Sequence, residues 1–200
     1  MIGWQSVAVR TVAMQIAAVL FFVPVAGHVA AAEEVPPKAA TCVACHGAGG
    51  NSVNPVVPSL AGQPQQFITT QLVMFREGNR KNAEMAPLAA NLSNADLHEL
   101  AAYFSAQPLV PLARTLAADK AAAAKSLTQQ YFCVNCHGHT LRGQMHIPRL
   151  AGQQTEYLRV QLRGFRASTR FDMDGQMSSA AQALTLADID VLAEYLSTLQ

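Results

Sequence analysis

Two short cysteine motifs stand out in this 200-residue chain because their residue types and spacing suit a covalent attachment site. Each motif has two cysteines separated by two residues, with a histidine directly after the second cysteine. The motifs are Cys42-Val43-Ala44-Cys45-His46 and Cys133-Val134-Asn135-Cys136-His137, and they contain all four cysteines of the chain. Residues three apart lie on one side of a helical turn, so both thiols of a motif can face one flat molecule.

Paired cysteines can also serve redox exchange, zinc binding or disulfide formation. A thioredoxin-type pair needs a βαβ setting, and no alternating β-branched run predicts a sheet here. A single four-cysteine zinc site would require the two distant pairs to converge on one metal. A disulfide within Cys-x-x-Cys would be strained and would leave the histidine unexplained. The spacing therefore predicts two covalently attached haem c groups, with His46 and His137 each ligating an iron.

The residues around the two motifs also recur, in the same order and with an offset of about 90 residues. Pro58-Ser59-Leu60-Ala61-Gly62-Gln63 matches Pro148-Arg149-Leu150-Ala151-Gly152-Gln153, and Gln71 and Arg80 match Gln161 and Arg170. We interpret this pattern as a tandem duplication in which each copy has its own haem.

A second axial ligand for each iron is expected from a methionine. Met85 and Met177 occupy equivalent positions in the repeat, at 39 and 40 residues after the motif histidines. Both lie in polar stretches, 79–87 and 168–179, which we expect to be irregular in structure. Met173 is the competing candidate in the second copy, whereas Met74 falls inside an expected helix and is assigned to the core.

The elements that position these groups are predicted to be helices and loops, which makes the protein all-α with two small helical domains. Apolar residues at helical spacing predict helices over 65–78 and 154–166. Ser93 and Thr185 are expected N-caps of helices that run to about 107 and 199. An Ala- and Lys-rich helix, 118–130, is expected to run into the second cysteine motif, whereas Pro36-Pro37 leaves little more than one turn before the first motif.

The domain boundaries follow from these elements and from the first residues of the chain. Residues 1–32 combine a lone Arg10, an apolar run and a small-residue stretch, which predicts a cleaved signal peptide and export to the periplasm. The first domain is then 33–107, the linker 108–117 and the second domain 118–200. Half of the residues are hydrophobic and the net charge is only +1, which excludes a disordered chain and gives no case for nucleic acid as a partner.

The sequence resembles the cytochrome c4 family, in which two class I cytochrome c domains follow one another. The segments that carry the resemblance are CVACHG and CVNCHG, PSLAGQ and PRLAGQ, FREGNRKNAEM and LSNADLHELAAYF. The resemblance implies that the backbone carbonyls of Pro58 and Pro148 accept hydrogen bonds from the two ligand histidines. Arg80 and Arg170 are candidates to pair with haem propionates, which are carboxylates suited to a guanidinium group.

Two haems with His46/Met85 and His137/Met177 ligation have no vacant iron site. We therefore expect a soluble, monomeric one-electron carrier, with no enzymatic activity of its own and no small-molecule substrate. The resemblance implies that its partners are membrane-bound or soluble redox proteins, namely a quinol-oxidising complex and a terminal oxidase or reductase. The alternative is a haem subunit that accepts electrons from a flavoprotein dehydrogenase to which it is docked.

Overall fold

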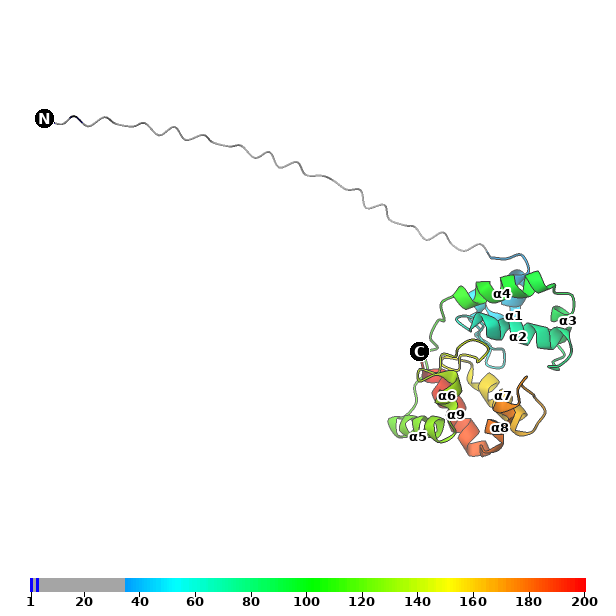
Figure 1. Cartoon of the computed structure of the whole chain (residues 1–200). Coiled ribbons are helices and arrows are strands. Elements are labelled where there is room, and N and C mark those ends of the chain that lie inside the picture. Colours follow the sequence, from blue (N-terminus) through cyan, green and yellow to red (C-terminus); the bar gives the residue numbers. More distant parts are fainter. Residues whose placement is uncertain (2, 4–34) are drawn as a thin grey trace. The chain divides into compact units, whose positions relative to one another are not determined.

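The computed structural model describes residues 1, 3 and 35–200, so the predicted signal peptide lies almost wholly outside the described residues. Along 35–200 the chain forms helices and no β-strand, apart from an isolated bridge between Gln144 and Ile147. The expected all-α class is therefore confirmed (Figure 1).

The helices occur in two similar sets, joined by a helix-free segment over 107–117. The first set is α1 (Ala39–His46), the 3-10 turn η1 (Ala48–Gly50), α2 (Gln65–Arg76), α3 (Met85–Ala89) and α4 (Asn94–Ala106). The second set is α5 (Ala118–Gln130), α6 (Cys133–His137), α7 (Thr155–Arg166), α8 (Gln176–Gln182) and α9 (Leu186–Thr198). In each set the last helix packs against the helix that follows the Pro-x-Leu-Ala-Gly-Gln segment: α4 on α2, and α9 on α7.

The last helix of each set begins at the predicted cap. Ser93 and Thr185 each accept a hydrogen bond from the backbone N–H three residues on, and Asp96 and Asp188 bond back to the cap backbone. Such a capping box satisfies two of the donors that a helix N-terminus leaves free. The buried faces of these helices form much of each core: Leu97, Leu100, Ala101 and Phe104 in α4, and Ile189, Leu192, Ala193 and Leu196 in α9.

The stretches around the candidate ligand methionines are more ordered than expected. Met85 begins the short helix α3, and Met177 lies in the first turn of α8, so the expectation of irregular structure was wrong for part of both stretches. The physical reason is a polar side chain placed before each helix. Asn82 accepts hydrogen bonds from the N–H groups of Glu84 and Met85, and a carboxylate, Asp172, plays the same part before α8.

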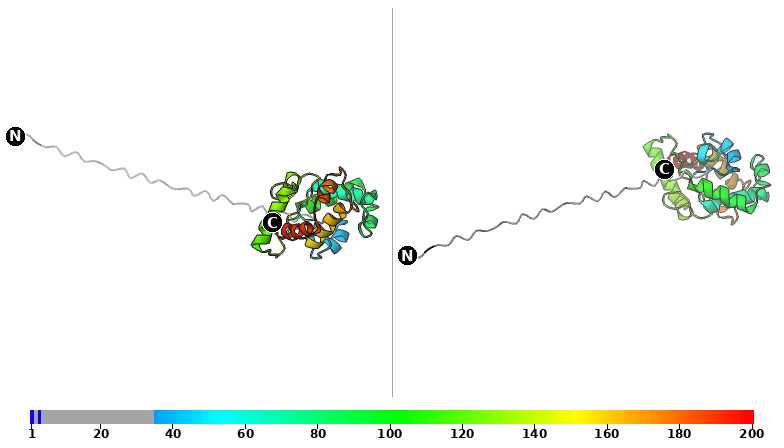
Figure 2. Two further views of the ribbon diagram at one scale, coloured as in Figure 1. Left: turned by 90° about the horizontal axis from the view of Figure 1, so that it is seen from below. Right: turned by 90° about the horizontal axis from the view of Figure 1, so that it is seen from above.

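The two cysteine motifs are approached differently. α1 begins at Ala39, three residues before the first cysteine, as the two prolines predicted. In the second half α5 ends at Gln130 and α6 starts afresh at Cys133, so the expected continuous helix is not observed. Phe132 adopts a left-handed conformation with φ of 57°, which turns the chain between the two helices. The turn leaves the Tyr131 hydroxyl within 3.0 Å of Asp188 in α9, against which α5 also packs (Figure 2).

Within residues 35–200, the two halves pack together in one compact unit. The N–H of Phe67 in α2 donates to the carbonyl of Met145 at 3.1 Å, and the N–H of Tyr157 in α7 donates to the carbonyl of Pro55 at 3.0 Å. These two bonds join equivalent positions of the repeat in opposite directions. The halves therefore contact one another through a nearly twofold-symmetric interface.

Candidate haem sites

All four cysteines lie within two short helices, α1 and α6, and none is joined in a disulfide. Cys42 and Cys133 are half-buried, whereas Cys45 and Cys136 are exposed. Burial raises the pKa of Cys42 and of Cys133 above the ordinary thiol value. Within 35–200, no three His, Cys, Asp or Glu side chains approach closely enough to hold a metal ion together.

The motif histidines are buried and fixed by one hydrogen bond each. Nδ1 of His46 lies 2.8 Å from the carbonyl oxygen of Pro58, and Nδ1 of His137 lies 2.8 Å from that of Pro148. A carbonyl only accepts hydrogen bonds, so each Nδ1 carries the proton and each Nε2 keeps its lone pair. Burial lowers the pKa of both histidines, and the bond to the proline carbonyl opposes this only in part. The imidazoles are thus neutral and ready to ligate through Nε2, and the implied role of both prolines is confirmed.

The candidate methionines differ in their surroundings. Met85 and Met177 are half-buried, and Met177 packs against the core of the second half. Met173, the competing candidate, has 77% of its surface exposed and belongs to no helix. A half-buried thioether beside the core is better placed than an exposed thioether to meet a buried histidine. The structure therefore favours Met177, and the assignment of both methionines as ligands stays a prediction.

Two further residues position these methionines and were missed in the sequence. Asn82 Oδ1 accepts from the N–H of Met85 at 2.7 Å, and Asp172 Oδ2 accepts from the N–H of Met177 at 2.8 Å. Asn82 and Asp172 are equivalent in the repeat, since they are 90 residues apart. Aligning the two copies on Arg80 and Arg170, which each lie two residues before a short polar residue suited to capping, could have found them.

The repeated arginines are not ordinary surface residues. Arg80 donates to Gln71 of its own half and crosses to the Tyr157 hydroxyl at 3.1 Å and to Gln161 at 3.0 Å. Arg170 donates to Gln161 as well, and each guanidinium stacks on a phenylalanine ring. Burial lowers the pKa of Arg170 to about 10.

The two arginines form a cluster with Tyr157 and Gln161, and one of its described atoms lacks a hydrogen-bond partner. Among the described side chains, Nε of Arg170 is buried and makes no hydrogen bond. A buried guanidinium N–H without an acceptor is costly unless an anion binds there. A haem propionate is such an anion, and the cluster lies where both halves can contribute to it. The cysteine thiols, the neutral histidines and the unpartnered Nε of Arg170 all fit haem c.

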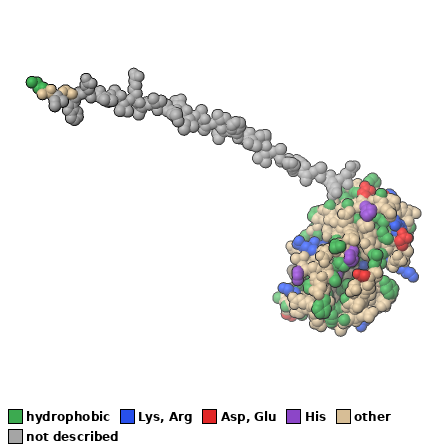
Figure 3. Space-filling model, viewed as in Figure 1, with side chains coloured by type: hydrophobic (Ala, Val, Ile, Leu, Met, Phe, Trp, Pro, Cys, Tyr) green, Lys and Arg blue, Asp and Glu red, His purple; other side chains and the backbone are tan. Residues whose placement is uncertain are grey.

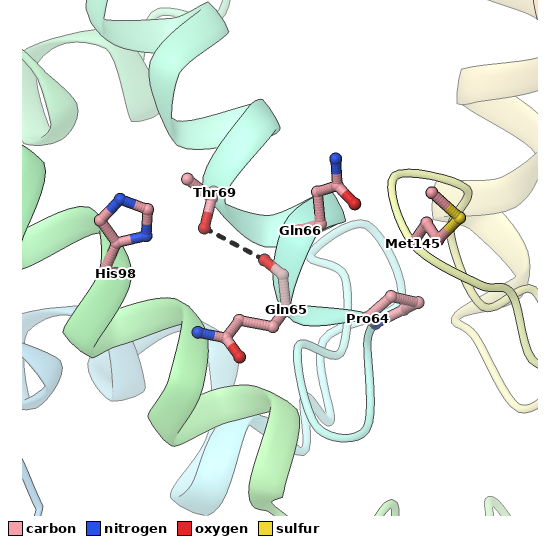
Figure 4. Close-up of a pocket in the computed structure, with 6 residues that line it drawn as sticks. All are labelled: Pro64, Gln65, Gln66, Thr69, His98 and Met145. Atoms are coloured by element: carbon pink, nitrogen blue, oxygen red, sulfur yellow. Dashed lines mark hydrogen bonds between the residues drawn. The ribbon is translucent and has the colours of Figure 1, made fainter.

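A surface cavity of about 400 Å³ lies apart from these groups. Its lining residues come from α2, α4 and the loop at Met145, and they include none of the candidate ligands (Figure 4). In this view the Thr69 hydroxyl donates a hydrogen bond to the backbone carbonyl of Gln65, and no buried charged side chain lines the cavity. We assign no role to this cavity in cofactor binding.

Comparison with known proteins matches each half of the chain to a cytochrome family model. The family model "Cytochrome C oxidase, cbb3-type, subunit III" matches residues 38–104, and the family model "Cytochrome c" matches residues 121–200. The fold and the sites thus define a two-domain c-type cytochrome, an electron-transfer protein that binds haem c. Within that class, the chain belongs to the cytochrome c4 family.

Three relatives show the extent of the similarity. Cytochrome c4 of Thiocapsa roseopersicina is 35% identical, over 86% of this chain and 98% of the relative. A protein of Thiomonas intermedia named "Thiosulfate dehydrogenase electron acceptor" is 34% identical, over 94% of this chain and 90% of the relative. The crystal structure of reduced cytochrome c4 from Pseudomonas stutzeri superposes with a TM-score of 0.75 at 31% identity, covering 82% of this chain and 95% of that one.

Proposed function

We propose that this protein is a periplasmic one-electron carrier with two haems, one attached at Cys42/Cys45 and the other at Cys133/Cys136. The observation that carries the proposal is the repeated histidine arrangement. In both halves a buried, neutral imidazole is held through Nδ1 by a proline carbonyl, which leaves Nε2 free for iron. This arrangement occurs twice in equivalent positions, which supports one complete site in each half.

Haem iron with histidine and methionine ligands supplies one-electron redox chemistry at a relatively high potential. The residues of this chain orient the ligands and exclude water from them. Asn82 and Asp172 hold the backbone at Met85 and Met177, so that each thioether is presented from the first turn of a helix. If His46 with Met85 and His137 with Met177 held the two irons, these side chains would leave no iron position open to a substrate, and the bound groups would supply one-electron transfer alone.

The partners proposed for the carrier are a quinol-oxidising complex as donor and a terminal oxidase or reductase as acceptor. A second candidate function is that of an electron-accepting partner of a dehydrogenase. The relative named as a thiosulfate dehydrogenase electron acceptor favours it, since it matches this chain over nearly its whole length. Both functions use the same sites and differ only in the donor.

Export to the periplasm is part of the proposal because cytochrome c maturation and the predicted signal peptide both point to it. No helix formed by residues 35–200 is long and apolar enough to cross a membrane. Mass spectrometry of the purified protein should give a chain that starts at about residue 33 and carries two haem masses.

The decisive test is the haem content of the protein and of Cys42→Ala and Cys133→Ala variants. The unaltered protein should stain for covalent haem on a denaturing gel and contain two haems per chain by its pyridine haemochrome spectrum. Each variant should keep one normal site and show a single thioether bond, or none, at the other. A polypeptide without covalent haem would contradict the proposal. Reduction by a purified quinol-oxidising complex or by a dehydrogenase would then separate the two candidate functions.

A further inference from the structure

Two buried glutamines cross from each half of the molecule into the other. Gln63 and Gln153 end the repeated Pro-x-Leu-Ala-Gly-Gln segments, and each has only 4% of its surface exposed. Gln153 accepts from the N–H of Ser59 at 2.8 Å and donates to the Ser59 carbonyl at 2.9 Å. Gln63 makes the same pair of bonds with Arg149, both at 2.9 Å. Each carboxamide therefore binds one residue of the opposite half at two points.

The residues that they bind are adjacent to the haem ligands' hydrogen-bond acceptors. Ser59 follows Pro58, so the N–H that donates to Gln153 and the carbonyl that accepts from His46 belong to the same peptide group. In the second half, the N–H of Arg149 and the carbonyl of Pro148 likewise form one peptide group. A continuous chain of hydrogen bonds thus runs from each histidine to a glutamine of the opposite half.

Hydrogen bonds in such a chain polarise one another. A peptide group whose N–H is engaged has a more negative carbonyl oxygen, and that oxygen is a stronger acceptor. A stronger acceptor at Nδ1–H makes an imidazole a more basic ligand, and a more basic ligand stabilises ferric over ferrous iron. The acceptor oxygen of the glutamine should therefore lower the reduction potential of the haem in the opposite half.

We propose that Gln153 and Gln63 are positioning residues that tune the axial histidine of the opposite half, Gln153 acting on His46 and Gln63 on His137. This inference rests on the proposed function, in which both histidines ligate haem iron. It gives the packing of the halves a role in electron transfer, because the hydrogen-bond chain of each ligand histidine ends on a glutamine of the other half.

The test uses the full two-haem protein with Gln153→Leu and Gln63→Leu, which remove the acceptor but keep most of the bulk. Gln153→Leu should favour reduction of the first-half haem about threefold, which is an upward shift of about 28 mV at 59 mV per tenfold. The second-half haem should keep its potential. Gln63→Leu should give the mirror result, with only the second-half haem raised. The two haems are assigned in the titration through Met85→Ala and Met177→Ala backgrounds.

A matched control separates tuning from simple loosening of the interface. Gln154 is fully buried and also crosses between the halves, since its side chain donates to the carbonyl of Ser52. It does not touch the Pro58–Ser59 peptide through its side chain. Gln154→Leu should lower the unfolding temperature and leave both potentials within error. If it shifts the first-half potential as much as Gln153→Leu does, the effect is structural and the inference fails.

A second readout reports the hydrogen bond itself. In the ferrous, diamagnetic protein, the Nδ1 proton of His46 should move upfield by proton NMR in Gln153→Leu, because its acceptor is weaker. The corresponding proton of His137 should stay in place. Unchanged potentials and unchanged proton shifts in both leucine variants, or a shift confined to the variant's own half, would overturn the inference.

A further variant keeps the test decisive if Gln153→Leu does not mature with both haems. Gln153→Glu retains an oxygen acceptor, and a carboxylate is a stronger acceptor than an amide. The first-half potential should then fall or stay constant, and a rise would refute the mechanism. Failure of the proposed function would look different, because the unaltered protein itself would lack two covalent low-spin haems.

Discussion

The state of a single nitrogen determines what each buried histidine can do. Because the carbonyls of Pro58 and Pro148 accept from Nδ1, the tautomer of His46 and His137 is set before any metal binds. Burial adds to this by lowering the pKa of both side chains, which keeps them neutral. A neutral imidazole with a free Nε2 is the form that ligates iron.

The methionine assignment can be tested with single substitutions. Thioether ligation of low-spin ferric haem gives a weak charge-transfer band at the red end of the visible spectrum. Met85→Ala and Met177→Ala should each remove roughly half of this band, because each would leave one iron without its sulfur ligand. Met173→Ala is the matched control, since this exposed side chain should leave the band intact. Loss of the band in Met173→Ala alone would reassign the ligand of the second half.

The half-buried carboxylate of Asp96 should titrate far from its usual range. Lys38, and to a smaller extent Ser93, donate hydrogen bonds to Asp96 and lower its pKa to about 2. A depressed folded-state pKa means that this stabilisation is present above about pH 4 and is lost as the pH falls toward 2. Lys38→Met should therefore raise the pKa of Asp96 toward the ordinary value in a carboxyl NMR titration. The pKa of Asp188, whose main partner is Thr185, should not move.

At the scale of single elements, capping decides where the last helix of each half begins. The capping boxes at Ser93 and Thr185 set the first residues of α4 and α9, and the buried faces of these helices form much of the two cores. Because the two capping boxes occupy equivalent positions in the two halves, the effect of removing one cap can be compared with the effect of removing the other. Local side-chain chemistry thus positions the helix that supports each site.

Removing either cap should cost a similar amount of stability. Ser93→Ala and Thr185→Ala should each lower the free energy of unfolding by about 1 kcal/mol, because one N–H of the first turn loses its acceptor. Urea denaturation followed by circular dichroism measures this. Ser126→Ala, near the end of the exposed face of α5, is a suitable control and should change the value by less than about 0.5 kcal/mol. Equal effects for all three variants would contradict the role of the caps.

Replacing a glycine in the loop before Pro148 should lower the free energy of unfolding more than replacing a glycine at a helix end. Gly143 has φ of +74°, and an added Cβ would lie 2.4 Å from the backbone carbon of Pro148. Gly78 has a similar φ of +72° but open space around it. Gly78→Ala should cost roughly 1–2 kcal/mol from the left-handed backbone alone. Gly143→Ala should cost more in the same denaturation assay, and should disturb the charge-transfer band of one haem, because the loop carrying the His137 acceptor must move.

At the scale of the whole molecule, the two halves differ in net charge and in the length of helix that precedes each cysteine motif. Residues 33–110 have four Lys/Arg and six Asp/Glu, whereas residues 111–200 have nine and seven. The net charges are therefore −2 and +2. On the face shown in Figure 3 these side chains are scattered among hydrophobic and uncharged side chains and form no large patch of one sign. Coverage also differs, since α5 packs on α9 in the second half, whereas the helix before the first motif begins only at Ala39.

Both differences predict a higher reduction potential for the second-half haem. Reduction adds a negative charge, which positive surroundings favour and nearby water opposes. A unit charge about 10 Å away at an effective dielectric of about 40 contributes roughly 0.8 kcal/mol, or about 35 mV. Screening by salt reduces this further, so the separation should be tens of millivolts. A potentiometric titration of the protein and of the two methionine variants measures it, and a higher first-half potential would contradict the charge argument.

Sequence alone predicted the haem chemistry, because it depends on residue types at short spacings, and the repeat, because the same short segments recur in the same order. Cys42–His46 and Cys133–His137 predicted covalent haem, and the caps at Ser93 and Thr185 placed two helices to within a residue. Such features are local, so they can be read from neighbouring positions.

Only the tertiary structure decided how the two copies cooperate. The bonds of Gln63 and Gln153 join residues 86 and 94 positions apart, and the Arg80–Tyr157 contact joins residues 77 apart. Short helices at Met85 and Met177 were likewise unexpected, because capping by Asn82 and Asp172 depends on how each loop folds back. Contacts between distant positions leave no periodic pattern in the chain. They arise when two folded halves bury complementary surfaces, which is why the interface that links the candidate haem sites could not be predicted from the sequence.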